Sequence, residues 1–426
     1  MSDFKGMLSY IETLPVIDTH EHLPEEPERL AQTVDFFTLF NTYVSNDMTA
    51  AGLGADGLKI LTSTAPVEDK WPVFNPVYKR IATGSYARAV HITTDRFYDV
   101  GRLASLEDAR TLTERMKAAN TKGLYEKVLR DACGFVTSLN FGETAAPSEY
   151  FTSVPFVSKY ADTATPAHVF EVERLSGLPA TSLDRFVKAL GAILEDERKR
   201  GARGFKFSTA YRRPLNFENV AESDAARVFN RILDEGRGSR EVGVGYEELR
   251  PLQDYLVHRM VEIAGDLDVT VAFHTGMQAS NWMNLDDTRP HRLWGLLNRH
   301  RGVRFNLLHA GFPWCEETAL IAKHLPNVYL DMAFVHLVSP RMAVRALKSF
   351  VDIVPRGKIL GFGGDYWVVE NVYGHLVLAR RNIARAFSEL VDESVLREDE
   401  ARRWVRSLMH DAAIEAYRLD IPPLAD

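Results

Sequence analysis

Cysteine is scarce in this chain: its 426 residues include two, Cys133 and Cys315. They lie far apart and outside any Cys-x-x-Cys arrangement, so we expect neither a disulfide framework nor a thiolate metal site. The sequence also lacks an apolar run of 18 or more residues, and it does not begin with the charged and then apolar layout of a signal peptide. These features predict a cytoplasmic protein without a membrane-spanning segment.

An excess of positive charge is lacking too. The chain has 51 basic and 58 acidic residues, a net charge of -7, and no arm rich in lysine or arginine. This balance argues against nucleic acid or a membrane surface as a partner. Hydrophobic residues make up 46% and charged residues 26%, as in ordinary soluble globular proteins. We expect a symmetric homo-oligomer, the usual state of a soluble enzyme.

Short apolar runs alternate with helical patterns along the chain. Residues 182–200 and 249–265 have apolar positions at helical spacing. Eight apolar runs predict β-strands, at 16–22, 134–139, 152–157, 203–207, 269–274, 304–309, 328–332 and 359–363. Such alternation indicates parallel βαβ units, and eight of them closing on themselves make a (β/α)₈ TIM barrel of the α/β class.

Two connections are too long for ordinary loops of a barrel. They span residues 24–130 and 211–242, and long structureless loops are rare in compact domains. We therefore expect helical insertions that cover the C-terminal mouth of one barrel domain spanning residues 1–426. A helix is predicted at 105–120 within the first insertion, and a last amphipathic helix at 398–417.

The first predicted strand ends in a His-x-His pair. Because side chains alternate along a strand, His20 and His22 share one face, with Asp18 beneath them. Glu21 points the other way and is not expected to be a metal ligand. Neutral imidazoles are preferred ligands of zinc and its first-row neighbours.

Later strands also end in polar residues, namely Lys206, His274, His309 and Asp365. Strand C-termini open on one face of a parallel barrel, where active sites lie. We predict one divalent metal held by His20, His22, His274 and Asp365, with zinc favoured and manganese as the alternative. Such an ion lowers the pKa of a coordinated water and polarises a carbonyl group. Asp365 would also accept the proton of the water and pass it to the leaving group.

The order of these polar strand ends resembles the amidohydrolase superfamily of metal-dependent barrels. Four motifs are similar to its amidohydrolase-2 branch, and within that branch to the amidohydrolase-like domain of the fungal FluG type: Gly204-Phe205-Lys206, Phe273-His274-Thr275-Gly276, Leu308-His309-Ala310-Gly311-Phe312-Pro313 and Gly363-Gly364-Asp365-Tyr366. The resemblance extends from Pro15 to Leu419. It implies a metal-dependent barrel but not a substrate, because the superfamily includes hydrolases, deaminases, decarboxylases and an isomerase.

The resemblance leaves three roles open for Lys206. In binuclear relatives a lysine at this position is carboxylated and bridges two metals, which would recruit His274 and His309 to the second ion. In mononuclear relatives His274 completes the first site, and His309 polarises the substrate carbonyl or orients water. Alternatively, Lys206 is a plain ammonium that grips a substrate carboxylate. The amidohydrolase-2 branch favours one metal.

Residues that follow the strands suggest the substrate class. Tyr211 and Arg212 come just after the fourth strand, and a planar guanidinium pairs bidentately with carboxylate. The neighbouring Arg213 is expected to face solvent. Trp314 and Trp367, together with Trp282, could form an apolar wall of the pocket. We therefore expect a small acidic substrate.

These observations predict a metal-dependent hydrolase that attacks a C–N or C–O bond of a small carboxylate-bearing substrate. The first alternative is a non-oxidative decarboxylase of the same branch. A uronate-isomerase-like isomerase is a further alternative, because residues 70–74 are faintly similar to the aromatic insertion of uronate isomerase, although Lys206 is then unexplained. A non-catalytic sensor domain is the last, since the FluG-type domain is attached to another enzyme.

Overall fold

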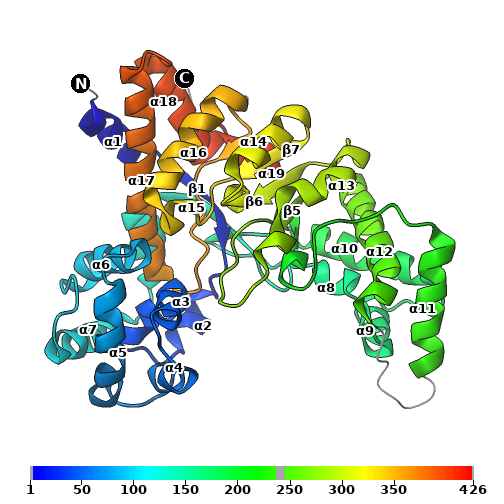
Figure 1. Cartoon of the computed structure of the whole chain (residues 1–426), viewed down its shortest axis with the longest axis horizontal. Coiled ribbons are helices and arrows are strands. Elements are labelled where there is room, and N and C mark those ends of the chain that lie inside the picture. The colour runs from blue at the N-terminus through cyan, green and yellow to red at the C-terminus, as the bar shows by residue number, and fades with distance from the viewer. Residues whose placement is uncertain (1–2, 237–244, 425–426) are drawn as a thin grey trace.

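The computed structural model describes residues 3–236 and 245–424, which form a barrel with helices around it (Figure 1). All eight predicted strands are present. The first three form one parallel sheet and the other five form a second: β1 Val16–Glu21, β2 Phe135–Asn140, β3 Phe151–Ser153, β4 Gly204–Phe207, β5 Thr270–His274, β6 Phe305–Leu308, β7 Val328–Asp331 and β8 Ile359–Leu360.

Backbone hydrogen bonds join the two sheets at both seams. Between β3 and β4, the Lys206 N–H donates to Pro155 O (2.8 Å) and the Val157 N–H donates to Lys206 O (3.0 Å). Between β8 and β1, the Thr19 N–H donates to Phe362 O (2.9 Å). The eight strands therefore follow one another around a barrel, which confirms the predicted (β/α)₈ fold.

Amphipathic helices cover the outside of the barrel. In α10 the apolar positions at helical spacing, including Phe186, Leu190 and Leu194, are buried, and the Ser182 Oγ caps the helix by accepting from the Arg185 N–H. The helices that follow the later strands are α10 Leu183–Lys199, α12 Tyr246–Asp266, α13 Trp294–Arg299, α14 Cys315–His324, α15 Val335–Val338, α16 Pro340–Ile353 and α17 Val369–Asp392.

The predicted C-terminal helix is interrupted. A π-helical turn at Ser407–Asp411 separates α18 Glu398–Arg406 from α19 Ala412–Tyr417. The turn brings the Leu408 carbonyl against the barrel, where it accepts the Gly361 N–H (2.7 Å). A Cβ atom at Gly361 would lie 2.7 Å from that carbonyl oxygen, so glycine is required for this close approach.

The segment between β1 and β2 folds into helices that gather beside one end of α17, at the lower left of Figure 1. Aromatic side chains of this insertion, such as Phe36 and Phe74, belong to the same hydrophobic cluster as the barrel residues. The helices are α2 Glu26–Leu30, η1 Phe36–Phe40, α3 Tyr43–Ala50, α4 Ala55–Thr62, α5 Val67–Ile81, α6 Ser85–Tyr98, α7 Leu106–Ala119 and the π-helical η2 Glu126–Ala132.

The remaining elements flank the sheets. Of the second predicted insertion, residues 211–236 contain α11 Glu222–Gly236, and residues 237–242 lie outside the described residues. Among the described helices, none combines the length and the apolar character needed to cross a bilayer. The other elements are α1 Phe4–Thr13, α8 Ser158–Ala161, α9 Pro166–Ser176, η3 Thr209–Tyr211, η4 Leu285–Thr288, η5 Pro290–Leu293 and η6 His309–Gly311.

Candidate metal centre

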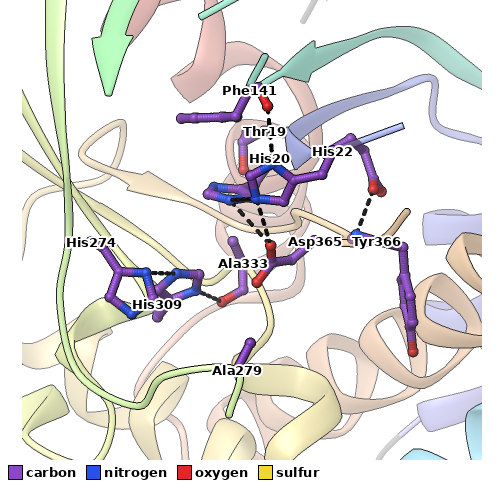
Figure 2. A network of polar contacts seen from close by, with 12 residues as sticks. Thr19, His20, His22, Phe141, His274, Ala279, His309, Ala333, Asp365 and Tyr366 are labelled. Atoms are coloured by element: carbon purple, nitrogen blue, oxygen red, sulfur yellow. Dashed lines mark hydrogen bonds and ion pairs between the residues drawn. The ribbon is translucent and has the colours of Figure 1, made fainter. Parts of the chain in front are cut away.

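Three predicted ligands meet at the C-terminal end of β1. Figure 2 shows the rings of His20 and His22 directed toward the carboxylate of Asp365. The Nε2 atoms of the two histidines each lie 3.2 Å from Asp365 Oδ1 and 3.2 Å from one another. Ligand atoms of a tetrahedral zinc with bonds near 2.0–2.1 Å are about 3.3 Å apart, so this spacing matches a metal centre.

The protonation states of this group also suit a cation. Burial lowers the pKa of His20 well below its usual range, and the charge of Lys206 adds to this effect. Burial alone would raise the pKa of Asp365, but the contacts with His20 and His22 outweigh it and hold that pKa well below its ordinary value.

The ring of His22 is oriented by the main chain. Its Nδ1 lies 3.0 Å from the Phe141 carbonyl and can donate to it, which leaves the Nε2 lone pair facing His20 and Asp365. The Nε2 atoms of both histidines and the ionised carboxylate of Asp365 then converge on one region. Because lone pairs in such proximity repel without a positive charge between them, the residues present fit a divalent metal.

The loop that carries Asp365 is held by β1 through three consecutive N–H groups. The Gly364 N–H donates to Asp18 Oδ1 (3.1 Å), the Asp365 N–H to His20 O (2.7 Å) and the Tyr366 N–H to Glu21 Oε2 (2.8 Å). Asp365 itself has φ +63°, a left-handed conformation that costs a non-glycine residue energy. The β1 contacts therefore fix a strained backbone at a proposed ligand.

Two glycines before Asp365 allow its loop to lie close against β1. A Cβ atom at Gly363 would lie 2.7 Å from the His20 Cβ, and one at Gly364 would lie 1.8 Å from Glu21 Oε1. Burial raises the pKa of Asp18 to about 7 and raises that of Glu21 as well, and the neighbouring Asp18 carboxyl adds to the rise at Glu21. Neither residue was predicted to act in the site, and both position Asp365.

The structure places His309 and His274 side by side. His309 Nε2 and His274 Nδ1 are 3.0 Å apart, and His309 Nδ1 lies 3.0 Å from the carbonyl of Ala333 (Figure 2). A nitrogen of His309, with ligand atoms of His20 and Asp365, belongs to a buried group whose members lie within 4.8 Å of one another. His274 is not in that group, and its Nε2 is buried without a hydrogen-bond partner among the described residues.

Lys206 lies at the base of the same space. Its Nζ is 5.0 Å from the ring centre of Phe141, and within residues 3–236 and 245–424 no hydrogen bond or ion pair of the amine is found. Burial lowers the pKa of Lys206 to about 7, against the opposing charges of Asp365 and Asp331. An amine in this state can be carboxylated or can bind an anionic group of a substrate.

A cavity of about 490 Å³, the inner cavity, opens over these groups. Trp367 stacks on the His22 ring with centres 4.8 Å apart, and the Tyr211 ring lies 4.6 Å from that of His274. Both were predicted to bind substrate. The lining residues are His20, His22, Phe141, Gly142, Glu143, Phe156, Lys206, Ser208, Tyr211, His274, Ala279, Asp365 and Trp367.

Comparison with known proteins agrees with this geometry. A family model described as Amidohydrolase matches residues 171–419, more than half of the chain. The chain belongs to the amidohydrolase family. Protein fluG of Emericella nidulans is 25% identical over 229 residues, which make up 52% of this chain. The aligned region covers 26% of that relative, so this amidohydrolase chain corresponds to about a quarter of its length.

Solved structures share the fold over the whole chain. A uronate isomerase from Thermotoga maritima has a TM-score of 0.79 at 17% identity, covering 98% of each chain. A glucuronate isomerase from Caulobacter crescentus has a TM-score of 0.75 at 18% identity, covering 99% of this chain and 94% of its own. A protein from Lactobacillus casei assigned as a metal-dependent hydrolase scores 0.65 at 17% identity, covering 97% of each. At these identities the likeness shows the fold alone.

Two predicted substrate-binding residues lie outside the inner cavity. Arg212 forms an ion pair with Asp162, and its side chain is 62% exposed. Trp314 lies beside Arg289, whose guanidinium is 5.8 Å from its ring centre. Neither residue lines the cavity, so we leave both out of the proposed site.

Two further expectations were wrong. Trp282 is 98% exposed and cannot form a pocket wall. Arg213 does not face solvent: it is buried, and its guanidinium lies 2.5 Å from Asp254. A guanidinium buried in this way needs its carboxylate partner, which the sequence places 41 residues further along the chain.

Sequence reasoning missed two polar residues at strand ends. Asp331, at the end of β7, accepts from the Thr19 hydroxyl (2.8 Å) and from the Ala333 N–H (2.9 Å), so it positions the carbonyl that orients His309. Asn140 ends β2. Both stand next to apolar runs, and a search for polar residues at every strand end would have found them.

Proposed function

We propose that this chain is a metal-dependent hydrolase that cleaves a C–N or C–O bond of a small carboxylate-bearing substrate. The observation that carries the proposal is the triangle of His20, His22 and Asp365 ligand atoms beneath a cavity large enough for a small molecule. One divalent ion, zinc or manganese, fits this ligand set, with His309 or His274 as a further nitrogen ligand. When bound, such an ion lowers the pKa of water and polarises a carbonyl oxygen.

The side chains of the inner cavity have distinct roles in this proposal. Asp365, held ionised, accepts a proton from the attacking water and returns it to the leaving nitrogen or oxygen. His309 donates its Nδ1 hydrogen to the Ala333 carbonyl, and burial lowers its pKa to about 4, so its Nε2 presents a lone pair that can accept from the attacking water and orient it. Lys206, an amine without a protein partner in the described residues, binds the carboxylate of the substrate. This role replaces the one predicted for Arg212.

Isomerisation is the second candidate. It is favoured by the likeness of the whole chain, insertion included, to the uronate isomerase of Thermotoga maritima. An isomerase moves hydrogen between adjacent carbons and incorporates no water. The carboxylate of a uronate would bind Lys206 as well, so substrate binding at this residue does not distinguish the two reactions. Their products do.

Product mass in ¹⁸O-water tests the proposal. We expect the metal-loaded protein to cleave at least one member of a panel of N-acyl amino acids and sugar lactones, with ¹⁸O in the new carboxylate. Conversion of D-glucuronate or D-galacturonate at unchanged carbon count and mass, without cleavage of the panel, would instead establish the isomerase.

A pair of histidine variants tests the metal centre. We expect close to one equivalent of metal in the wild type, and loss of metal and turnover in His20→Ala/His22→Ala. His291→Ala removes an exposed imidazole away from the cavity and is the matched control. Full turnover by the double variant, or by exhaustively chelated wild type, would refute a metal mechanism.

A further inference from the structure

A second and larger cavity adjoins the inner one. This outer cavity has a volume of about 1050 Å³ and lies between the barrel mouth and the insertion that follows β1. The two cavities share His22, Phe141, Gly142, Ala279 and Trp367 among their lining residues. They therefore meet beside a proposed metal ligand, and one substrate can occupy both.

The insertion supplies uncommitted polar groups to the outer cavity. Carboxamides of Gln32 and Asn41 and hydroxyls of Thr33, Thr42 and Thr64 line it. None of these five side chains has a hydrogen-bond partner within residues 3–236 and 245–424, which leaves donors and acceptors of both kinds for a ligand.

The barrel side contributes one more acceptor. Asn140 ends β2 and lines the outer cavity, and its Nδ2 donates to Leu23 O (2.9 Å). Its Oδ1 is buried and has no partner among the described residues. A buried acceptor of this kind costs free energy unless a ligand or water donates to it.

The charges of the outer cavity nearly cancel. Lys70, which is 2% exposed, forms an ion pair with Asp35, and Glu68 pairs with Arg110 at 2.7 Å. The other charged lining residues are one acid, Glu28, and one base, Lys117, and none of the arginines that the structure describes lines the wall. Phosphate or carboxylate is usually bound by arginine or lysine. The one base here outside an ion pair in the described part of the chain, Lys117, is balanced by one acid, Glu28, so a wall made mainly of neutral amides and hydroxyls suits an uncharged ligand that bears hydroxyl groups.

At the junction the wall is aromatic. Trp367 is 49% exposed and lines both cavities. Its indole ring stacks on the ring of His22, with the two ring centres 4.8 Å apart. An exposed indole face can pack against the apolar face of a ring or chain whose hydroxyls point toward the amides and threonines.

We propose that the outer cavity binds a neutral, hydroxyl-rich group that forms the leaving part of the substrate, an inference that rests on the hydrolase proposed above. The substrate is then a conjugate in which a small dicarboxylic acid is joined to this group through an amide or ester bond. The free carboxylate binds Lys206, and the bond to be cleaved lies beside His22 and Asp365. Water oxygen bonds to the acyl carbon, the C–N or C–O bond breaks, one water proton goes to the leaving nitrogen or oxygen, and the products are a carboxylic acid and a neutral polyol or aminosugar.

Binding of two non-cleavable probes to the metal-loaded protein tests the cavity separately from the reaction. The probes are 4-(β-D-glucopyranosylthio)butanoate and 4-(cyclohexylthio)butanoate, which share the carboxylate arm and differ in the hydroxylated ring. By calorimetry we expect the glucosyl probe to bind about tenfold tighter, the effect of about two ordinary hydrogen bonds. In Asn41→Leu/Thr42→Val the preference should fall below about threefold, whereas Asn298→Leu/Thr181→Val, outside both cavities, should retain it.

Equal affinity of the two probes, no binding of either, or an unchanged preference in the Asn41→Leu/Thr42→Val variant would overturn the proposal. Cleavage assays with N-succinyl-D-glucosamine and N-succinyl-cyclohexylamine separate it from the proposed function. Preferential probe binding without cleavage of either amide supports the outer cavity and counts against the hydrolase. Cleavage of both amides at equal kcat/KM supports the hydrolase and overturns the outer cavity.

Discussion

Replacing Glu21 by leucine tests whether the loop carrying Asp365 is held in place from β1. Glu21 is fully buried, and its Oε2 accepts the Tyr366 N–H at 2.8 Å. Leucine has a similar size but no acceptor, so the N–H loses its partner and the strained conformation at Asp365, with φ +63°, is free to relax. The carboxylate would then move away from the Nε2 atoms of His20 and His22.

The expected loss falls mainly on metal affinity. Removing a group that orients a metal ligand typically costs 10–100-fold in affinity, or about 1.4–2.8 kcal/mol. The buried Tyr366 N–H without an acceptor would destabilise the fold by about 1–3 kcal/mol. Part of this cost is offset, because burial raises the pKa of Glu21 and the folded protein therefore disfavours its charge. We expect Glu21→Gln, which keeps an acceptor for Tyr366 and can donate to Asp18, to bind metal within about threefold of the wild type.

A competitive chelator titration measures the dissociation constant, and urea unfolding measures stability in the same variants. Glu197→Leu is the matched control, because Glu197 is also buried and accepts a backbone N–H, that of Ala145 at 2.6 Å, but lines neither cavity. It should lose stability and keep its metal affinity. Metal affinity in Glu21→Leu equal to that of Glu197→Leu would show that β1 does not position Asp365.

Three other predictions concern stability. Arg213→Met leaves Asp254 buried with its main partner removed and should cost about 3–5 kcal/mol in urea unfolding. Arg212→Met removes a guanidinium that is 62% exposed from Asp162, whose side chain is 12% exposed, and should cost less, about 1–2 kcal/mol. Equal costs would contradict the assignment of Arg213 to the interior. Burial lowers the pKa of His336 to about 4, below the 6.5 of the unfolded chain, so the unfolded state binds the proton first and the unfolding free energy falls as the pH drops from 6.5 to 4. This fall should be about 3 kcal/mol smaller in His336→Gln. Identical pH profiles of the two proteins would refute the prediction. In Gly374→Ala the new Cβ would lie 2.0 Å from the Ala89 carbonyl oxygen, so the contact of α17 with α6 should weaken. The unfolding free energy should then fall by about 1–3 kcal/mol. An unchanged unfolding free energy would mean that the two helices can separate without cost.

Most of the strands could be predicted because they are buried on both sides, although in β3 only Phe151 is fully buried. Parallel strands of a barrel appear as short continuous apolar runs, and this pattern located all eight. The predicted ends of the strands were less accurate. The last run was predicted to continue to residue 363, but β8 ends at Leu360 because the Gly361 N–H is bonded to Leu408 O. That partner lies in a π-helical turn that no helical periodicity indicates.

Side chains that depend on distant partners could not be placed from the sequence. Arg212 and Arg213 are adjacent, and neither spacing nor hydropathy says which one turns inward. The outcome is decided by Asp162 and Asp254, which reach them from α8's C-terminal end and from α12. His20, His22 and Asp365 were predictable because strand order alone brings β1 next to β8 in a closed barrel.

Whether His274 or His309 lies with His20 and Asp365 could be predicted only in part. His274 ends β5 and His309 follows β6, the neighbouring parallel strand. His274 pairs in register with Leu308, so strand order places the two imidazoles at nearly equal depth. The backbone makes the difference: His309 has φ +62°, which turns its ring toward the Ala333 carbonyl and brings it into the group with His20 and Asp365. A left-handed residue in the His-Ala-Gly turn is not readable from hydrophobic periodicity. Whether His274 or His309 joins the proposed ligands therefore depends on the backbone conformation of His309, the first residue after β6, which the prediction of strands does not give.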